Sequence, residues 1–341
     1  MIKYKDENFT LIYYENSKLI NEINLLKTNF INNKFNFPDI KKIQMYNLFK
    51  FKINKKNLND FEDVKIDSLK INNCKFYFKF FKSKKSTGKL FIVNPGIGSF
   101  SSDNISMTSS FYFINYLLHD NYDVIILFRE YILDGVFYYE PFNFSYYLNI
   151  FIKYIIGSNL FFIKEIYLVG ISAGCNTLLH YVSKLDSYVY KNYIKKCFII
   201  SCSPYIKHNI LNLSLVNNKL LSGLIISKLN KKPFNIYKKK LSYNMYNLIG
   251  DIGKINNNFN SIDQYFDSLE LTNDSINKIK IPLILLNSDD DDIARMRLME
   301  KFIDNFSLNS NFHFIVTKYG WHGTFYNKDN KFIYDIINTF L

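Results

Sequence analysis

A serine with the surroundings of a nucleophile lies at position 172, inside the sequence GISAG of residues 170–174. The apolar run EIYLVG (165–170) predicts a buried strand before it, and the residues from Ala173 to about Lys184 predict a helix after it. Between a strand and a helix, G-x-S-x-G forms a sharp turn that raises the serine hydroxyl above the sheet. The start of the helix also directs the Ala173 amide toward a place where a negative oxygen can form. We therefore expect Ser172 to act as a nucleophile.

The histidine best placed to serve this serine as a base is His322, which follows the last predicted strand in a loop between Gly320 and Gly323. A serine of ordinary pKa needs such a base. The other histidines have more ordinary positions: His119 ends a predicted helix, His180 lies within the helix after the serine, His208 lies in a helical insertion, and His313 lies inside a strand.

The acid that orients this histidine is expected in the run Asp289–Asp292, which follows the preceding strand. A run of aspartates could instead form a calcium loop. Counting from Asp289, however, Ile293 and Ala294 stand where that loop needs an oxygen ligand and a glycine, so we expect no metal. The chain order serine, aspartate, histidine is typical of α/β hydrolases. This reasoning leaves the choice of aspartate open.

A second glycine-containing loop, NPGIGS (94–99), follows the apolar run KLFIVN (89–94). We expect the amide of Ile97, together with that of Ala173, to stabilise an oxyanion beside the serine. The loop matches neither G-x-G-x-x-G nor G-x-x-x-x-G-K-[ST], so no nucleotide and no other cofactor is expected.

The elements that must position these loops alternate between apolar strands and helices. Strands are predicted as a hairpin in 64–71 and 74–81, and at 89–94, 123–129, 165–170, 196–202, 281–287 and 311–317; helices are predicted near 105–120, 142–156, 173–184, 294–306 and 328–341. This order predicts a mostly parallel sheet with helices on both faces. Residues 205–275 are expected to form a helical cap insertion within a domain covering 66–341, and residues 1–65 an extension without an assigned structure.

The composition explains why the net charge of +13 is a weak functional clue. Of the 43 basic residues, 40 are lysines, and alanine occurs only at Ala173 and Ala294, as an AT-rich coding sequence would impose. Arginine is the residue that phosphate and base recognition needs most, so a nucleic-acid binder is disfavoured.

Hydrophobic residues make up 48% of the chain, which excludes a wholly disordered protein. Six of the 12 glycines lie in the three candidate loops, where larger residues would not fit.

Neither a secretory signal nor a membrane-spanning run is visible in the sequence. The four cysteines form no C-x-x-C pair and have no metal-binding spacing. We expect an intracellular protein, either cytoplasmic or associated with a membrane surface.

Four stretches resemble the α/β-hydrolase superfamily, and within it the branch of embryogenesis-associated proteins and their lipid- and ester-hydrolysing relatives. They are GISAGCNTLLHY (170–181), SCSPY (201–205), IPLILLNSDDD (281–291) and GWHG (320–323), and the similarity spans roughly 70–330. The resemblance implies an α/β-hydrolase fold, with Ser172 as nucleophile, His322 as base and Asp291, rather than Asp290, as the acid. It also implies cleavage of carboxylic esters, including lipid or acylglycerol esters, through an acyl-enzyme.

The cap carries a possible membrane-binding helix. Within 211–232, six residues are expected on one apolar face: Leu213, Val216, Leu220, Leu221, Leu224 and Ile225. Lys228, Lys231 and Lys232 follow, and such a basic amphipathic helix could rest on an anionic membrane while covering an acyl pocket. An ordinary cap helix in a lysine-rich chain is the alternative.

Two other functions fit the same residues. A catalytically silent protein of this fold could bind a lipid or a partner. An acyltransferase could use the same acyl-enzyme with an alcohol as acceptor. Water and an alcohol both stay open as the acceptor.

Overall fold

The computed structural model describes residues 1–32, 34, 37–38, 63–64, 68–101, 112–185, 192–231, 241–296, 303–304, 309–323, 325 and 331–341. Its strands are β1 (Ile2–Lys5), β2 (Phe9–Tyr13), β3 (Asp63–Val64), β4 (Ser68–Ile71), β5 (Cys74–Phe81), β6 (Lys89–Asn94), β7 (Asp123–Leu133), β8 (Val136–Tyr139), β9 (Glu165–Ile171), β10 (Ile194–Ile200), β11 (Leu283–Ser288) and β12 (Phe312–Thr317). Its helices are α1 (Ile20–Ile31), α3 (Tyr112–His119), α4 (Ser145–Gly157), α5 (Ala173–Ser183), α7 (Ile206–Leu211), α8 (Leu215–Leu229), α9 (Met245–Asn257), α10 (Ile262–Ser268), α11 (Asn273–Asn277) and α13 (Phe332–Thr339).

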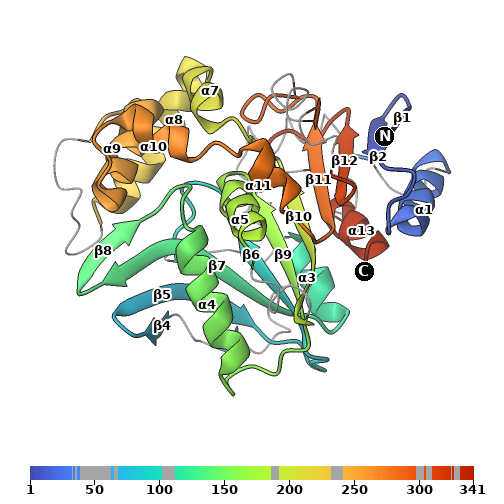
Figure 1. Ribbon diagram of the computed structural model, residues 1–341, viewed down its shortest axis with the longest axis horizontal. Helices are drawn as coiled ribbons and strands as arrows, with labels where there is room; N and C mark the ends of the chain where they lie inside the picture. The colour runs from blue at the N-terminus through green and yellow to red at the C-terminus, as the bar shows by residue number, and fades with distance from the viewer. Residues whose placement is uncertain are drawn as a thin grey trace.

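The strands form one mixed sheet with the order β1-β2-β12-β11-β10-β9-β6-β7-β5-β3 (Figure 1). The central block from β12 to β7 is parallel throughout, as the continuous apolar runs predicted. Because parallel strands end at one edge, the loops after β6, β9, β11 and β12 converge there. The predicted hairpin β4–β5 is confirmed and joins the sheet through β7.

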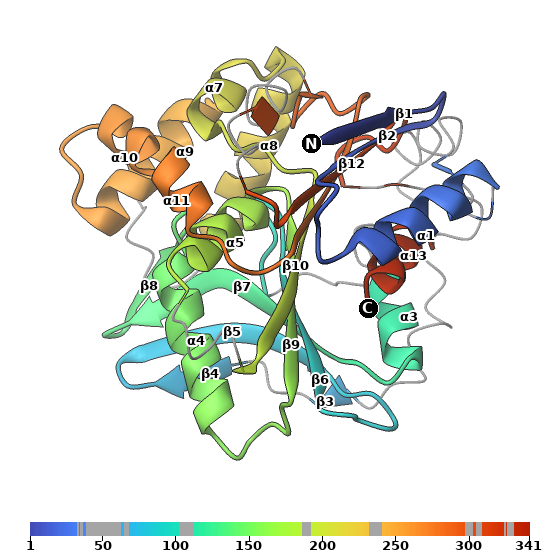
Figure 2. The same cartoon turned by 45° about the vertical axis from the view of Figure 1, so that its right-hand side comes forward.

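Helices cover both faces of the sheet (Figure 2). On one face, α4 and α5 pack on a core that includes Leu148, Phe151 and Leu178. On the other, α1, α3 and α13 pack on a core that includes Phe30 and Phe332. The predicted layers are therefore confirmed. Most of the predicted helix 294–306 lies outside the described residues.

Residues 1–31, for which we made no structural prediction, contribute two strands to this sheet and the helix α1. Strand β2 pairs antiparallel with β12 and β1 pairs with β2, so the sheet continues past the boundary expected near residue 66. Strand β8 was also missed. It pairs with β7 across Asp134 and Gly135, whose φ angles are 49° and 82°. An Asp-Gly pair of this kind is a hairpin signal that the sequence analysis overlooked.

Helices α7, α8, α9 and α10 form the cap, and no strand occurs in the described part of 205–275. The cap has its own apolar core, which includes Ile225, Leu248 and Tyr265, and it also packs on Ala173 beside the serine. Figure 1 shows the cap at the end of the sheet where the parallel strands finish.

One expectation about α8 was wrong. Its apolar residues do not share a single face: Ile225 is fully buried and Leu221 partly buried, whereas Val216, Leu220 and Leu224 are exposed. The exposed three are spaced by four residues and form a ridge along one side of the helix. We call these three residues the α8 ridge.

Candidate active site

Ser172 lies on a strained turn between β9 and α5. Its φ of 53° is in the left-handed region, which side chains other than glycine rarely adopt. The flanking glycines leave no room for a side chain. A Cβ on Gly170 would lie 2.9 Å from the Cα of Cys175, and one on Gly174 would lie 2.8 Å from the carbonyl oxygen of Pro95. The turn therefore holds β9, α5 and the 94–99 loop together around the serine.

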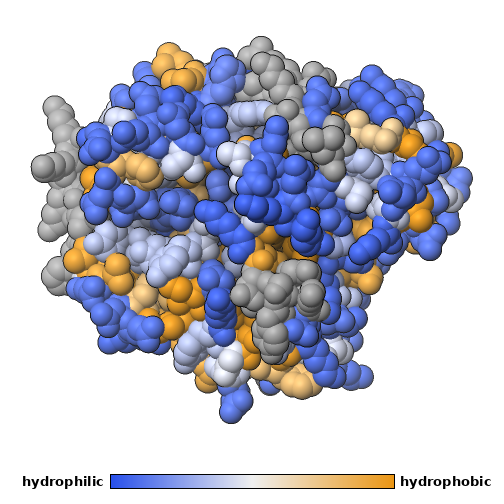
Figure 3. Space-filling model, in the orientation of Figure 1, coloured by the Kyte–Doolittle hydropathy of each residue, from blue (hydrophilic) through white to orange (hydrophobic). Residues whose placement is uncertain are grey.

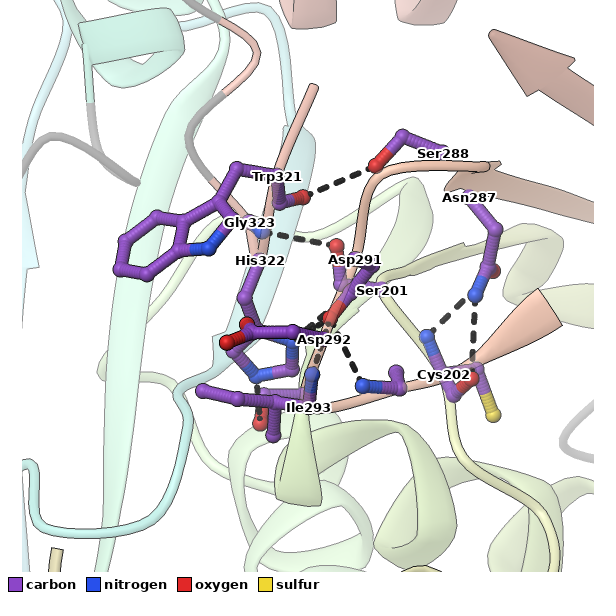
Figure 4. A network of polar contacts seen from close by, with 12 residues as sticks. Ser201, Cys202, Asn287, Ser288, Asp291, Asp292, Ile293, Trp321, His322 and Gly323 are labelled. Atoms are coloured by element: carbon purple, nitrogen blue, oxygen red, sulfur yellow. Dashed lines mark hydrogen bonds and ion pairs between the residues drawn. The ribbon is translucent and has the colours of Figure 1, made fainter. Parts of the chain in front are cut away.

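A continuous chain of hydrogen bonds joins Ser172, His322 and Asp291. Figure 4 shows Asp291 and His322 among their neighbours. The Oγ of Ser172 lies 2.7 Å from Nε2 of His322, and Nδ1 of His322 lies 2.9 Å and 3.1 Å from the two carboxylate oxygens of Asp291. Because Nδ1 donates to the carboxylate in the neutral ring, Nε2 is left free to accept the serine proton. The sequence predicted these three residues from three loops, and the structure brings them together.

The neighbouring aspartates have other partners. Asp291 is buried, and its Oδ1 also accepts hydrogen bonds from the amides of Ile293 (2.9 Å) and Ala294 (2.7 Å). Asp290 instead accepts from the Trp321 amide at 2.7 Å, and so braces the loop that carries His322. Asp292 accepts from the side chain of Asn217 in the cap at 2.8 Å.

The pKa values of the buried pair shift in opposite directions. Burial alone would raise the pKa of Asp291, but the charge and hydrogen bond of His322, helped by the two amides, lower it below its ordinary value. Burial alone would lower the pKa of His322, but the charge and hydrogen bond of Asp291, with a contribution from Asp292, raise it above 6.5. Each residue therefore favours the charged form of the other.

The 94–99 loop lies directly against the serine. A Cβ on Gly96 would be 3.3 Å from the Cβ of Ser172. The hydroxyl of Tyr139 accepts a hydrogen bond from the Gly98 amide at 2.9 Å. Among the described residues, the amides of Ile97 and Ala173 have no hydrogen-bond acceptor, and both residues line the cavity that contains Ser172. Both amides are thus available to an oxygen bound there.

Two residues to which the sequence analysis gave no role in the site support these loops. Ser201 follows β10 with a φ of 53°, and its hydroxyl accepts from the Gly323 amide at 2.8 Å, next to His322. Lys228 extends from α8 to the carbonyl oxygen of Gly98 at 2.8 Å. The position of Ser201 at a strand's carboxyl end was a usable signal, whereas nothing in the sequence pairs Lys228 with Gly98.

The cavity over Ser172 has about 430 Å³ of free space, including its open mouth. Its wall is mainly apolar and combines the catalytic loops with the cap; it is lined by Ile97, Phe142, Ser172, Ala173, Asn176, Ser201, Ser203, Ile206, Asn209, Ile210, Leu213, Leu221, Met245, Ile293 and His322. Within the ranges described above, His, Cys, Asp and Glu side chains form no group of three or more that could hold a metal ion.

Two further histidines and two cap lysines lie outside the catalytic group. His180 is buried and bonds to the carbonyl oxygen of Leu269 at 2.9 Å, and His313 lies in β12 against the hydroxyl of Ser17 at 3.3 Å. Lys231 is exposed, whereas Lys232 lies outside the described residues. In the part of the chain that the structure covers, no helix is both long enough and apolar enough to span a membrane.

No protein-family model and no curated protein matches this sequence. Solved structures do. An esterase from Pyrococcus furiosus aligns with a TM-score of 0.55 at 17% identity, covering 85% of this chain and 94% of the esterase. Est1E from Butyrivibrio proteoclasticus, with ferulic acid bound, aligns with a TM-score of 0.51 at 13% identity, covering 80% and 96%.

A third similar structure is the acylaminoacyl peptidase of Pyrococcus horikoshii, with a TM-score of 0.52 at 13% identity over 83% of this chain and 42% of the peptidase. These alignments show that the chain has the α/β-hydrolase fold. They show the fold alone, and the resemblance to the embryogenesis-associated branch rests on the sequence motifs.

Proposed function

We propose that this protein is a serine hydrolase that cleaves carboxylic esters through an acyl-enzyme on Ser172. The observation that carries the proposal is the unbroken hydrogen-bond chain from Ser172 through His322 to Asp291. Two structural neighbours whose chains are aligned over almost their whole length support the proposal, because one is named an esterase and the other holds ferulic acid.

In the acylation step, the Oγ of Ser172 attacks the ester carbonyl carbon while its proton passes to Nε2 of His322. The carbonyl oxygen becomes an oxyanion and accepts hydrogen bonds from the amides of Ile97 and Ala173. The imidazolium that forms is stabilised by Asp291. When the C–O bond to the alcohol breaks, His322 returns the proton to the leaving oxygen.

Deacylation repeats these steps with water. His322 takes a proton from a water molecule as that water attacks the acyl carbon, and the proton then returns to Ser172 as the acid leaves. An alcohol in place of water would make the same acyl-enzyme an acyltransferase. Analysis of products formed with and without added alcohol distinguishes the two.

The apolar wall supports an ester with a hydrocarbon acyl group, including lipid esters. The α8 ridge adds a second reason. Its residues are 65%, 66% and 42% exposed, and exposed Lys231 follows at the end of the helix. A surface of this kind can rest on an anionic lipid layer. Lys228 would contribute little to that contact, because its ammonium is held on Gly98.

Hydrolysis of p-nitrophenyl butyrate by purified protein tests the proposal. Ser172→Ala should abolish turnover, whereas Ser158→Ala should keep it, because the Ser158 hydroxyl donates to the Ile155 carbonyl oxygen at the end of α4 and Ser158 is not among the residues that line the cavity. If the wild-type protein shows no esterase activity on activated esters of several acyl lengths, the catalytically silent alternative is favoured.

A further inference from the structure

Two residues in the wall of the cavity each carry a buried polar atom that bonds to no described residue. Oδ1 of Asn209 and Oγ of Ser203 are both buried without a hydrogen bond to any described residue. Asn209 is only 6% exposed, and both residues line the cavity that contains Ser172. A buried polar atom without a partner destabilises the protein unless something else binds it, so such atoms are rare in folded chains.

The orientation of Asn209 is fixed by its other bonds. Its Nδ2 donates to the carbonyl oxygen of Ile293, which identifies the remaining end of the amide as the oxygen. Its backbone amide donates to Tyr205 at 2.9 Å, and its carbonyl oxygen accepts from Asn212 at 3.2 Å. The side-chain oxygen is therefore the one group of Asn209 that the described residues do not satisfy.

Ser203 has a similar arrangement. Its carbonyl oxygen accepts from Nδ2 of Asn176 at 3.1 Å, and Asn176 also lines the cavity. The chain at Ser203 is thus fixed to α5 while the hydroxyl has no partner. Asn176, Ser203 and Asn209 give the mainly apolar wall a polar section.

Hydrogen bonds connect Asn209 to the acid and the base of the site. It bonds to Ile293, whose own amide donates to Asp291, and Asp291 holds His322. In ester cleavage the base returns its proton to the leaving alcohol, so the alcohol part of the ester must lie near His322. The acyl oxygen lies instead near the amides of Ile97 and Ala173.

We propose that Asn209 and Ser203 form a polar subsite for a second hydroxyl group on the alcohol part of the substrate. The inference rests on the proposed esterase function. Oδ1 of Asn209 can only accept, so the group it binds must be a donor, such as a hydroxyl. The preferred substrates are then esters of alcohols that carry a further hydroxyl, such as polyol esters, rather than simple alkyl esters.

The test compares 1-butyrylglycerol with propyl butyrate, which have the same acyl group and the same three-carbon alcohol skeleton. We expect the wild-type kcat/KM to be about 10-fold or more higher for the glycerol ester, because a buried acceptor left unpaired disfavours the alkyl ester. Asn209→Leu and Ser203→Ala should each reduce that ratio toward one. Asn212→Leu, which makes the same change just after the same helix and outside the cavity wall, should not.

The subsite is overturned if the wild-type ratio of the two kcat/KM values is near one, or if that ratio is unchanged in folded Asn209→Leu and Ser203→Ala. A site that holds only water gives this result. Ser203→Ala guards against a misfolded Asn209 variant, because the Ser203 hydroxyl has no partner to lose.

Binding of two ethers tests the subsite without catalysis. By NMR titration, wild-type protein should bind 1-butylglycerol ether more tightly than butyl propyl ether, and Asn209→Leu should remove the difference. Absence of esterase activity with this preference intact would refute the hydrolase and keep the subsite. Activity with equal affinities would do the reverse.

Discussion

The ammonium group of Lys228, on cap helix α8, donates a hydrogen bond to the carbonyl oxygen of Gly98, 2.8 Å away in the loop that carries the Ile97 amide. On the other side of the same residue, the Gly98 amide donates to the hydroxyl of Tyr139. The same ammonium lies 5.4 Å from the centre of the Phe100 ring. The cap therefore contributes directly to the position of the proposed oxyanion site.

Replacing Lys228 by methionine removes this bond and keeps most of the apolar stem. We expect kcat to fall about 10-fold with little change in KM, less than the ~10²–10³ typical of losing an oxyanion donor itself. The affinity for a trifluoromethyl ketone inhibitor, which forms a tetrahedral adduct, should fall with kcat. Lys231→Met is the control. If kcat and inhibitor affinity are both unchanged, Lys228 does not position the loop.

The fall of kcat/KM at low pH should report the protonation of His322. Asp291 raises the pKa of His322 above 6.5, so the ring stays protonated to a higher pH than an isolated histidine and cannot accept the Ser172 proton there. Wild-type kcat/KM should therefore fall as pH drops, with a midpoint above 6.5. Asp291→Asn should shift that midpoint downward and reduce kcat by roughly 10⁴. A wild-type midpoint below 6.5 would contradict the assignment.

The same shift has a consequence for stability. A histidine whose pKa is raised in the folded state stabilises it fully below the unfolded pKa, and this contribution is lost as pH rises through the folded value. The advantage in stability that the wild-type protein has over Asp291→Asn should therefore shrink as the pH rises through the raised pKa of His322, above 6.5.

Substitution of Gly174 tests the packing behind the serine. A Cβ there would overlap the carbonyl oxygen of Asn94, so Gly174→Ala should lower the free energy of unfolding by about 3 kcal/mol or more. It should also slow the covalent reaction of Ser172 with a fluorophosphonate probe. Gly157 at the end of α4 has no atom within 4 Å of an added Cβ, and Gly157→Ala should be close to neutral. Chemical denaturation of both variants makes the comparison; equal stabilities would show that the loop contact at Gly174 is not required.

The α8 ridge predicts binding to lipid surfaces. On the face shown in Figure 3, hydrophobic residues gather at the edge of the cap beside α7, whereas most of the cap is hydrophilic. Co-sedimentation with phosphatidylserine vesicles should detect the wild-type protein, and Val216→Gln with Leu220→Gln should reduce binding several-fold. The control is Leu160, which is also an exposed leucine and lies after α4; Leu160→Gln should have no effect. Failure of the wild-type protein to sediment, or equal binding by the ridge variant, would exclude this surface.

The sequence was most informative where the backbone accepts few residues. Ser172 and His322 could be placed because glycine, alanine and tryptophan are scarce in this chain and gather around both. Asp291 needed the resemblance as well, since four consecutive aspartates look alike until Ile293, Ala294 and His322 bind one of them.

Contacts between distant segments were beyond sequence reasoning. Spacing on α8 predicted one apolar face, but packing against α9 buries Ile225 and leaves Leu220 exposed. The bond from Lys228 to Gly98 joins residues 130 positions apart, and the unpartnered oxygen of Asn209 is defined only by what surrounds it. Such features depend on tertiary packing and leave no local pattern.

The most direct test of the central claim is covalent labelling of Ser172 by a fluorophosphonate probe, read by intact-protein and peptide mass spectrometry. The probe reacts with serines that a neighbouring base activates. We predict one equivalent of label on the peptide containing Ser172, complete loss of labelling in Ser172→Ala, and strongly slowed labelling in a folded His322→Gln variant. A folded wild-type protein that takes up no probe, or takes it up equally in Ser172→Ala, would contradict the account.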